Sequence, residues 1–436
     1  MSNADKPLKL EEGFYEFSDT LRYIRDEAIY RMIAPDALLF SLLARVSASI
    51  PPSWVLPNFT GSYGTPSLCV AIVGRAGIGK SQANSAAREL LAFSHDEYRF
   101  DLSSGTGQGM IESYLYPARK GEAGYEEGRK IQRYLGQHFY IDEGSTLIAA
   151  ATKKEDITAD TIRSLWSGET VGQTNASATT SRYLPARSAS FGLGVGFQPD
   201  IAATFVTLGA GVGTPQRFLW SYASNRDQPD YAPEPKGRIH SALLQHSADQ
   251  IKVFGFDPSI GLEIRLTRAA IMREHVTIDP LETHDKLKQM KVAACLARLE
   301  GETVVDTQRW ELAGMIIEVS KNVLHDIRDK GREAEQAIRE ERSDHKAESV
   351  LRIAEKTRDQ AIKAGAACMG RKLHKEVKAL TFSELSQAVS SDDRKRSSAE
   401  EMIGLLLRQG WGEEISNNNG KTAYKAGRET PPPASR

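Results

Sequence analysis

The chain has 436 residues, about three times the commonest domain size, so two or three folded units are expected. With 40% hydrophobic and 26% charged residues it has the composition of a globular protein, which excludes a wholly disordered, collagen-like or disulfide-dense chain. Because 56 Lys and Arg nearly balance 57 Asp and Glu, the net charge of −1 does not indicate a generally nucleic-acid-binding or membrane-binding surface. Any DNA contact must therefore be made by a small basic region of the surface.

The cysteine pattern and the hydropathy predict a cytoplasmic protein without membrane contact. Cys69, Cys295 and Cys368 are far apart and lack the short paired spacing of a zinc site or a disulfide framework, so we expect reduced thiols. No apolar run approaches the roughly 20 residues that cross a bilayer, and the N-terminal residues MSNADKPLKLEE contain no signal-peptide core.

Residues 1–60 are predicted to form a helical N-terminal unit. Apolar residues recur at helical spacing between Pro35 and Ile50, Pro35 fits a first helical turn, and Pro51-Pro52 ends the helix. Residues 14–32 contain helix formers and no interior Gly or Pro.

Residues 61–226 are predicted to form an α/β core with a parallel sheet. Five short apolar runs of strand type follow one another, separated by helical or loop sequence: LCVAIV, YRFDLS, HFYID, SFGLGVGF and RFLWSY. This alternation of strands and helices is typical of parallel sheets covered by helices.

The rest of the chain, nearly half of its residues, is predicted to be mainly helical. Residues 227–327, which begin with a Pro-rich linker, form a helical lid, and residues 328–372, with charges of both signs, form a solvated helical connector. Residues 373–427 show two helices and a hairpin, the outline of a winged helix, and residues 428–436 are predicted to be a disordered tail.

A phosphate-binding motif lies between the first predicted strand of the core and the helix that follows. The residues GRAGIGKS satisfy G-x-x-x-x-G-K-[ST], in which Gly74, Gly77 and Gly79 let the backbone N–H groups turn inward. Lys80 is expected to reach the β- and γ-phosphates, and Ser81 to offer its hydroxyl to Mg²⁺. The motif thus predicts ATP and Mg²⁺ as cofactors.

Two carboxylates follow the apolar strand HFYI, at the strand end where ligands bind in such sheets. Asp142 is expected to complete the Mg²⁺ shell, and Glu143 to orient and deprotonate the attacking water. An acidic turn without function is the alternative. The glycine-rich loop SSGTGQG has no lysine and is interpreted as turn geometry.

The residues after Glu143 resemble an AAA+ ATPase. The stretch SGETVGQTNASATTSRYLPARSASFGLGVGFQPD resembles the part of minichromosome-maintenance helicases in which a hairpin precedes a strand that ends in a sensor residue. Gln198-Pro199 stands where those families have Asn-Pro, so the resemblance implies that Gln198 is a sensor. The segment GTPQRFLW resembles the one that carries an arginine finger, which implies that role for Arg217. A local ion pair is the alternative for this arginine.

Residues 40–320 are also similar to P-loop replication proteins of actinobacterial phages and mobile elements. The similarity rests on ARVSASIPP, LPNFTGSYGTPSLCVAIVGRAGIGKS, SSGTGQGM, GFQPD, GTPQRFLW and KVAACLARLEG. It implies a helicase-like ATPase that works with a primase-polymerase. The resemblance to ring ATPases further implies an oligomeric ring, expected to be a hexamer, on single-stranded or forked DNA.

The predicted hairpin between Thr170 and Phe191 is the candidate DNA contact. It has small polar residues at its tip and Arg182 and Arg187 on the returning strand. In the ring helicases that it resembles, this hairpin grips the DNA backbone in the central channel, which requires positive charge. The alternative is that these arginines are exposed charges that keep an edge hairpin soluble.

Two further groups of basic residues have alternative interpretations. Lys288 and Lys291 in the helical lid are candidate second sensors or part of a solvated helix face. Arg394, Lys395 and Arg396, expected between two helices of the winged helix, are candidate phosphate contacts or part of a polar turn.

Three functions remain open at this stage. A ring helicase or translocase accounts for the motif, the hairpin, the finger and the winged helix together, and an AAA+ initiator or loader that remodels DNA without processive unwinding accounts for them almost as well. A kinase or nucleotide-dependent switch accounts only for the phosphate motif and the Mg²⁺ residues.

Overall fold

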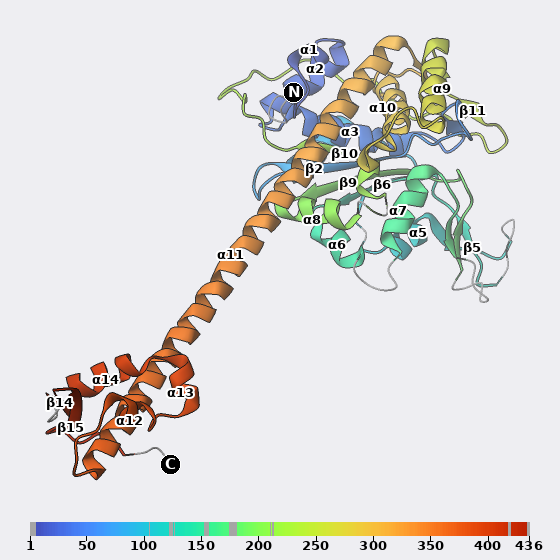
Figure 1. Cartoon of the computed structure of the whole chain (residues 1–436). Coiled ribbons are helices and arrows are strands. Elements are labelled where there is room, and N and C mark those ends of the chain that lie inside the picture. The colour runs from blue at the N-terminus through green and yellow to red at the C-terminus, as the bar shows by residue number, and fades with distance from the viewer. Residues whose placement is uncertain are drawn as a thin grey trace. The chain divides into compact units, whose positions relative to one another are not determined.

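The structure is a computed structural model of the whole chain (Figure 1). It separates into two compact units, Met1–Glu333 and Ala334–Arg436, and the predicted boundaries near residues 60, 226 and 327 all lie within the first. The described residues are 6–103, 105–121, 125, 127–151, 157–173, 181–209, 211, 213–416 and 420–433.

A five-stranded parallel sheet lies at the centre of the first unit, in the order β10-β2-β9-β6-β3. Its strands are the five predicted apolar runs, so the predicted α/β class with a parallel sheet is confirmed at this level. Every residue of β2 and β9 is buried, as expected for central strands covered on both faces. The bounds are β2 (Leu68–Val73), β3 (Tyr98–Leu102), β6 (Gly136–Ile141), β9 (Ser190–Phe197) and β10 (Phe218–Tyr222).

The two faces of β9 differ because its residues alternate between glycine and larger apolar side chains. The glycines face α3 (Pro35–Ser49), where a Cβ on Gly192 would lie 2.0 Å from the carbonyl oxygen of Ala44. The apolar side chains face the helices on the other side of the sheet, where the ring centroids of Phe197 and Phe205 are 5.1 Å apart. Those helices are α5 (Gly107–Tyr114), α7 (Thr158–Ser167) and α8 (Pro199–Gly209) (Figure 1).

The predicted N-terminal helices are present but share one hydrophobic core with the sheet. The helices α1 (Glu12–Tyr15) and α2 (Asp19–Tyr30) pack beside α3, whose residues are buried from Asp36 to its end. A helix that is buried around its whole circumference needs neighbours on every side, so α3 belongs to the interior of the core.

A buried ion pair fixes α3 to the rest of the core. Nη1 of Arg45 lies 2.8 Å from Oδ1 of Asp101, and Asn84 of α4 (Lys80–Leu90) donates to the same carboxylate. Burial alone would raise the pKa of Asp101, but the nearby His138 and the hydrogen-bonded guanidinium of Arg45 lower it well below its ordinary value. These contacts join α3 and α4 to the strands β3 and β6 of the sheet.

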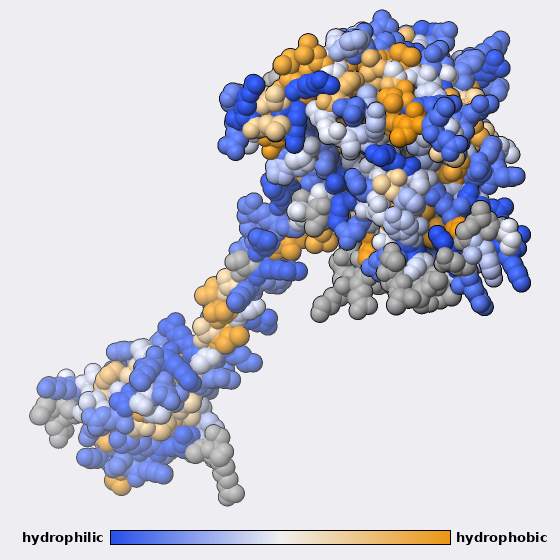
Figure 2. Space-filling model, turned by 90° about the vertical axis from the view of Figure 1, so that its right-hand side faces the viewer, coloured by the Kyte–Doolittle hydropathy of each residue, from blue (hydrophilic) through white to orange (hydrophobic). Residues whose placement is uncertain are grey.

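Small two-stranded sheets and the lid helices complete the first unit. The sequence did not predict most of these strands, because two or three residues carry no readable period. In α9 (Pro258–Met272), the side chains of Leu262, Leu266 and Met272 are exposed. Figure 2 shows separate hydrophobic patches on the largely hydrophilic surface. The elements are β1 (Trp54–Val55) with β11 (Lys252–Val253), β4 (Leu115–Pro117) with β5 (Lys130–Gln132), β7 (Val171–Gln173) with β8 (Arg182–Leu184), β12 (Gly255–Phe256) with β13 (Val304–Val305), α6 (Ser145–Ala151), α9 (Pro258–Met272) and α10 (Asp285–Leu299).

One helix, α11 (Thr307–Lys375), contributes to both units. It joins two predicted pieces, the last helix of the predicted lid and the charged connector, and it ends at Lys375, just after the predicted start of the C-terminal domain at residue 373. From Ala334 to Gln360 its described side chains are almost all exposed, as predicted for a solvated connector.

The second unit has its own hydrophobic core of residues such as Met369, Met402 and Leu406. Capping boxes begin two of its helices. Residues 428–433, predicted as a disordered tail, are described, and the carbonyl of Pro432 accepts a hydrogen bond from Arg371. The elements after α11 are α12 (Phe382–Ser386), α13 (Ser391–Arg396), α14 (Ala399–Arg408) and the antiparallel pair β14 (Gly412–Ser416) and β15 (Thr422–Ala426).

The three cysteines are free thiols, as predicted. Within the described part of the chain, no helix combines the length and apolarity that crossing a membrane requires.

Candidate active site

The glycine-rich motif forms a tight loop between β2 and α4, as the sequence predicted. Gly77 and Gly79 have φ angles of +79° and +102°, in the left-handed region that glycine tolerates. Gly74 is restricted by space, because a Cβ there would lie 2.4 Å from Cγ2 of Ile78. Nζ of Lys80 donates to the carbonyl oxygens of Gly74 and Arg75, each at 2.9 Å, so the ammonium group is held inside its own loop.

A cavity of about 250 Å³ opens beside this loop at the carboxyl end of the sheet. It brings together the predicted residues Lys80, Ser81, Asp142, Glu143 and Gln198. The other lining residues are Ala76, Gly77, Gly79, Gln82, Gly144, Ser145, Gly196 and Ile201. Gly74 contributes its carbonyl to Lys80 without lining the cavity.

The strand order explains why these residues meet. Lys80 follows β2, Asp142 and Glu143 follow β6, and Gln198 follows β9, which lies between β2 and β6. Parallel strands carry their carboxyl ends to one edge of the sheet, so Gln198 lies between the lysine loop and the two carboxylates.

The Asp142 carboxylate has a partner that the sequence analysis missed. The hydroxyl of Tyr140 donates to Oδ1 of Asp142 at 3.0 Å. Burial raises the pKa of Tyr140, and the charge of Asp142 raises it further, so the phenol stays protonated at neutral pH. The available signal was the position of Tyr140 two residues before Asp142, because alternate residues of a strand share one face.

The site can hold Mg²⁺ through a hydroxyl and a carboxylate. Ser81 and Asp142 supply hard oxygen ligands, which Mg²⁺ prefers, and nucleotide phosphates supply further oxygens in such sites. Among the residues that the structure describes, no group of three His, Cys, Asp or Glu side chains forms a site that holds a metal by itself. The donor set therefore fits a metal bound together with a nucleotide.

Arg217 lies outside this cavity and is held within the chain. Its Nη1 donates to the carbonyl of Gly213, and its Cζ lies 5.3 Å from the ring centroid of Trp166. Its Nε is buried and, among the described residues, has no hydrogen-bond partner. Burial lowers the pKa of Arg217, and the charge of Arg163 lowers it further. No carboxylate in the described ranges pairs with Arg217, so the alternative of a local ion pair is not what holds it.

The interpretation of Lys288 and Lys291 as a solvated helix face is wrong. Lys288 is 1% exposed and pairs with Asp285, whose Oδ1 lies 2.9 Å from Nζ. Lys291 is fully buried; its Nζ donates to the carbonyls of Thr65 and Trp166 and lies 4.2 Å from the centre of the Trp166 ring. Neither lysine lines the cavity beside the glycine-rich loop, because α10 packs with this face toward α3 and β2.

Replacing Lys291 by methionine is expected to remove a pH dependence of stability. Burial lowers the pKa of Lys291 to about 7, whereas a lysine in an unfolded chain has a pKa of roughly 10.4. Between these values the unfolded chain binds more protons, so the wild-type free energy of unfolding rises with pH by up to about 1.4 kcal/mol per unit. Urea unfolding of Lys291→Met between pH 7 and 9 is expected to lack this contribution.

The matched control for this measurement is Lys286→Met, in the same helix but with a partly exposed side chain. That variant is expected to keep the wild-type slope. Equal slopes in wild type and Lys291→Met would contradict the assignment of the slope to the buried ammonium group.

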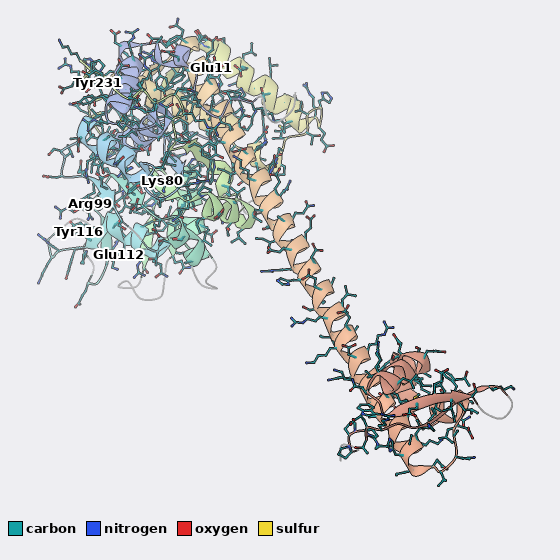
Figure 3. The ribbon with its side chains drawn as sticks, turned by 90° about the vertical axis from the view of Figure 1, so that its left-hand side faces the viewer. Glu11, Lys80, Arg99, Glu112, Tyr116 and Tyr231 are labelled. Carbon is teal, nitrogen blue, oxygen red and sulfur yellow. The ribbon has the colours of Figure 1, made fainter. Side chains whose placement is uncertain are left out.

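The candidate DNA hairpin is present, but its arginines have other surroundings than expected. Arg182, in β8, lies with Nε 2.7 Å from Oε2 of Glu112, so it is held in an ion pair within the chain. Lys130 contacts the other oxygen of the same carboxylate at 2.6 Å. Arg187 lies beyond the strand, in a turn with a φ angle of +57°, and lines a separate cavity. Figure 3 shows Glu112 well apart from Lys80, and the predicted hairpin tip at residues 174–180 lies outside the described residues.

The basic residues Arg394, Lys395 and Arg396 lie between α12 and α14, as expected, but they form the last turn of the short helix α13 and not a polar turn. Cations at this position interact favourably with the carboxyl end of a helix, which gives them a local role independent of DNA.

Comparison of the chain with models of protein families and with curated proteins finds no match in either case.

Proposed function

We propose that the chain is an AAA+ P-loop ATPase that acts as a helicase or translocase on DNA in phage or mobile-element replication. The observation that carries the proposal is the meeting of Lys80, Ser81, Asp142, Glu143 and Gln198 at one cavity. A cation, a hydroxyl, two carboxylates and an amide are the groups that ATP hydrolysis requires.

Each residue has a role in this proposal that follows from its chemistry. Lys80 would exchange its two carbonyl partners for phosphate oxygens, and Ser81 and Asp142 would hold Mg²⁺. Bound Mg²⁺ would neutralise phosphate charge. Glu143 accepts a proton from the attacking water. Gln198, which follows the strand β9 between β2 and β6, donates a hydrogen bond from its amide to the γ-phosphate.

Assembly into a hexameric ring would bring Arg217 of one subunit to the ATP of the next. In the single chain the guanidinium donates to the carbonyl of Gly213 and lies over Trp166, so it would leave these contacts to reach the ATP of the next subunit. In α9, Leu262 and Leu266 are 60% and 62% exposed and one helical turn apart, which offers an apolar face to a second copy.

DNA contact is proposed for the hairpin β7–β8, with Arg187 as its candidate cation. A second DNA contact is proposed for the second unit, as a winged helix. In that unit α14 has Glu400 and Glu401 in its first turn, a poor match to the negative phosphates that flank a DNA groove. Arg394, Lys395 and Arg396 on α13 are the better candidates for phosphate contacts.

The pairing of Arg182 with Glu112 favours a second candidate function, an AAA+ initiator or loader that remodels DNA without processive unwinding. A hairpin whose arginine is held in an ion pair within the chain contacts the DNA backbone less readily than a hairpin with two unpaired cations. A primase-polymerase is a proposed partner for either function.

ATP turnover by the full-length protein is expected to increase severalfold with single-stranded DNA, and a slowly hydrolysed ATP analogue is expected to produce hexamers. Turnover is measured by phosphate release, and particle mass by light scattering. Unwinding of a forked duplex would identify the helicase, and DNA-stimulated turnover without unwinding would identify the initiator or loader. A monomer whose turnover ignores DNA would reject both in favour of a kinase or switch.

A further inference from the structure

Tyr140 lies at the border between the core and the candidate active site. It is partly buried in β6, on the strand face that also carries Asp142, and its hydroxyl reaches Oδ1 of that carboxylate at 3.0 Å. Asp142 itself lies after the strand end and is exposed at the cavity. The hydroxyl therefore connects a side chain fixed by packing to one that faces the ligand.

The neighbouring strand leaves the space that this arrangement needs. A Cβ on Gly194 would lie 3.2 Å from Cδ2 of Tyr140, closer than side chains ordinarily pack. A Cβ on Gly196 would lie 2.5 Å from the carbonyl oxygen of Asp142 and 3.6 Å from the Tyr140 hydroxyl. The missing side chains at Gly194 and Gly196 thus leave the space in which the Tyr140 ring lies beside the Asp142 carboxylate.

The Tyr140 hydroxyl restricts the orientation of the Asp142 carboxylate and leaves its negative charge intact, so its effect goes beyond packing. A neutral O–H donor on Oδ1 fixes the rotation of the Asp142 side chain, whereas an Arg or Lys partner would also cancel its charge. The second oxygen remains available as a ligand. Partners of this kind orient metal ligands, and losing them typically weakens metal binding by roughly 10- to 100-fold.

We propose that Tyr140 is a positioning residue whose hydroxyl orients Asp142 for Mg²⁺ bound together with ATP. This inference rests on the proposed function, since it assigns Asp142 to the metal. It gives the GLGVG segment of β9 a role in the site, namely to leave room for the tyrosine.

The test is Tyr140→Phe, which removes one oxygen atom and keeps the ring. Binding of a fluorescent ATP analogue is measured without metal and during titration with Mg²⁺, and Mn²⁺ binding to the ADP complex is followed by electron paramagnetic resonance. The expected result is metal-free nucleotide binding like wild type and a Mg²⁺ half-saturation raised about tenfold. Turnover is expected to recover at high Mg²⁺ concentration.

Tyr98→Phe is the matched control. Tyr98 is a buried tyrosine of the same sheet whose hydroxyl has no hydrogen-bond partner among the described residues. Its variant is expected to keep the wild-type Mg²⁺ half-saturation. If Tyr140→Phe does the same, the positioning role is overturned.

Gly194→Ala provides an independent variant that keeps the hydroxyl and presses on the ring. Gly194→Ala is also expected to raise the Mg²⁺ concentration at half-saturation. If Tyr140→Phe does not fold, the result for Gly194→Ala tests the positioning role. A wild-type Mg²⁺ response in folded Gly194→Ala would then overturn the inference. The proposed function fails in a different way, namely if wild-type nucleotide binding does not respond to Mg²⁺ at all.

Discussion

Lys80→Ala is expected to lose ATP hydrolysis by at least about 100-fold, because it removes the cation held against the phosphates. The ammonium also bridges the carbonyls of Gly74 and Arg75, so its loss loosens the loop that must cradle the nucleotide. Nucleotide affinity, measured with a fluorescent ATP analogue, is therefore expected to fall together with turnover.

Glu143→Gln is expected to separate binding from chemistry at the same cavity. The amide keeps the size of the carboxylate but cannot accept the proton of water, so ATP binds while turnover falls about 10²- to 10⁴-fold. Glu234→Gln, at an exposed position away from the cavity, controls for the loss of a negative charge. Wild-type turnover by Glu143→Gln would show that another group activates the water.

Arg217→Ala is expected to bind ATP normally and to lose hydrolysis by about 10³-fold or more, as removal of a finger does. A finger stabilises charge that develops only in the transition state, so nucleotide affinity does not reveal it. Arg217→Lys keeps the charge but loses the planar group that lies over Trp166, so its turnover is expected to fall as well.

Mixing variants tests whether Arg217 acts between subunits. A Lys80→Ala subunit still presents its arginine, and an Arg217→Ala subunit has an intact glycine-rich loop, so mixed rings are expected to regain part of the activity that each variant lacks. Subunit exchange is verified by energy transfer between labelled subunits. A mixture that exchanges and stays inactive, or normal hydrolysis by Arg217→Ala alone, would make Arg217 a structural residue that packs on Trp166.

The sequence by itself determined the elements whose signal is local. The five strands of the sheet, the long N-terminal helix and the turn between β2 and α4 follow from residue type and spacing over five to fifteen residues. The motif also identified Lys80 and Ser81, because glycine spacing reflects the backbone conformation that phosphate binding requires. Asp142 and Glu143 could be placed at the cavity because a parallel sheet brings its carboxyl strand ends together.

Only the tertiary structure decided which polar side chains are exposed and which are paired. Lys291 has the same local sequence character as a surface lysine, yet it is buried against the carbonyls of Thr65 and Trp166, more than a hundred residues away. The pairing of Arg182 with Glu112 and the space that Gly194 leaves for Tyr140 likewise join segments distant in the chain. The physical reason is that burial and electrostatic pairing depend on the groups that folding places nearby, and a single sequence encodes those neighbours only through the complete packed arrangement.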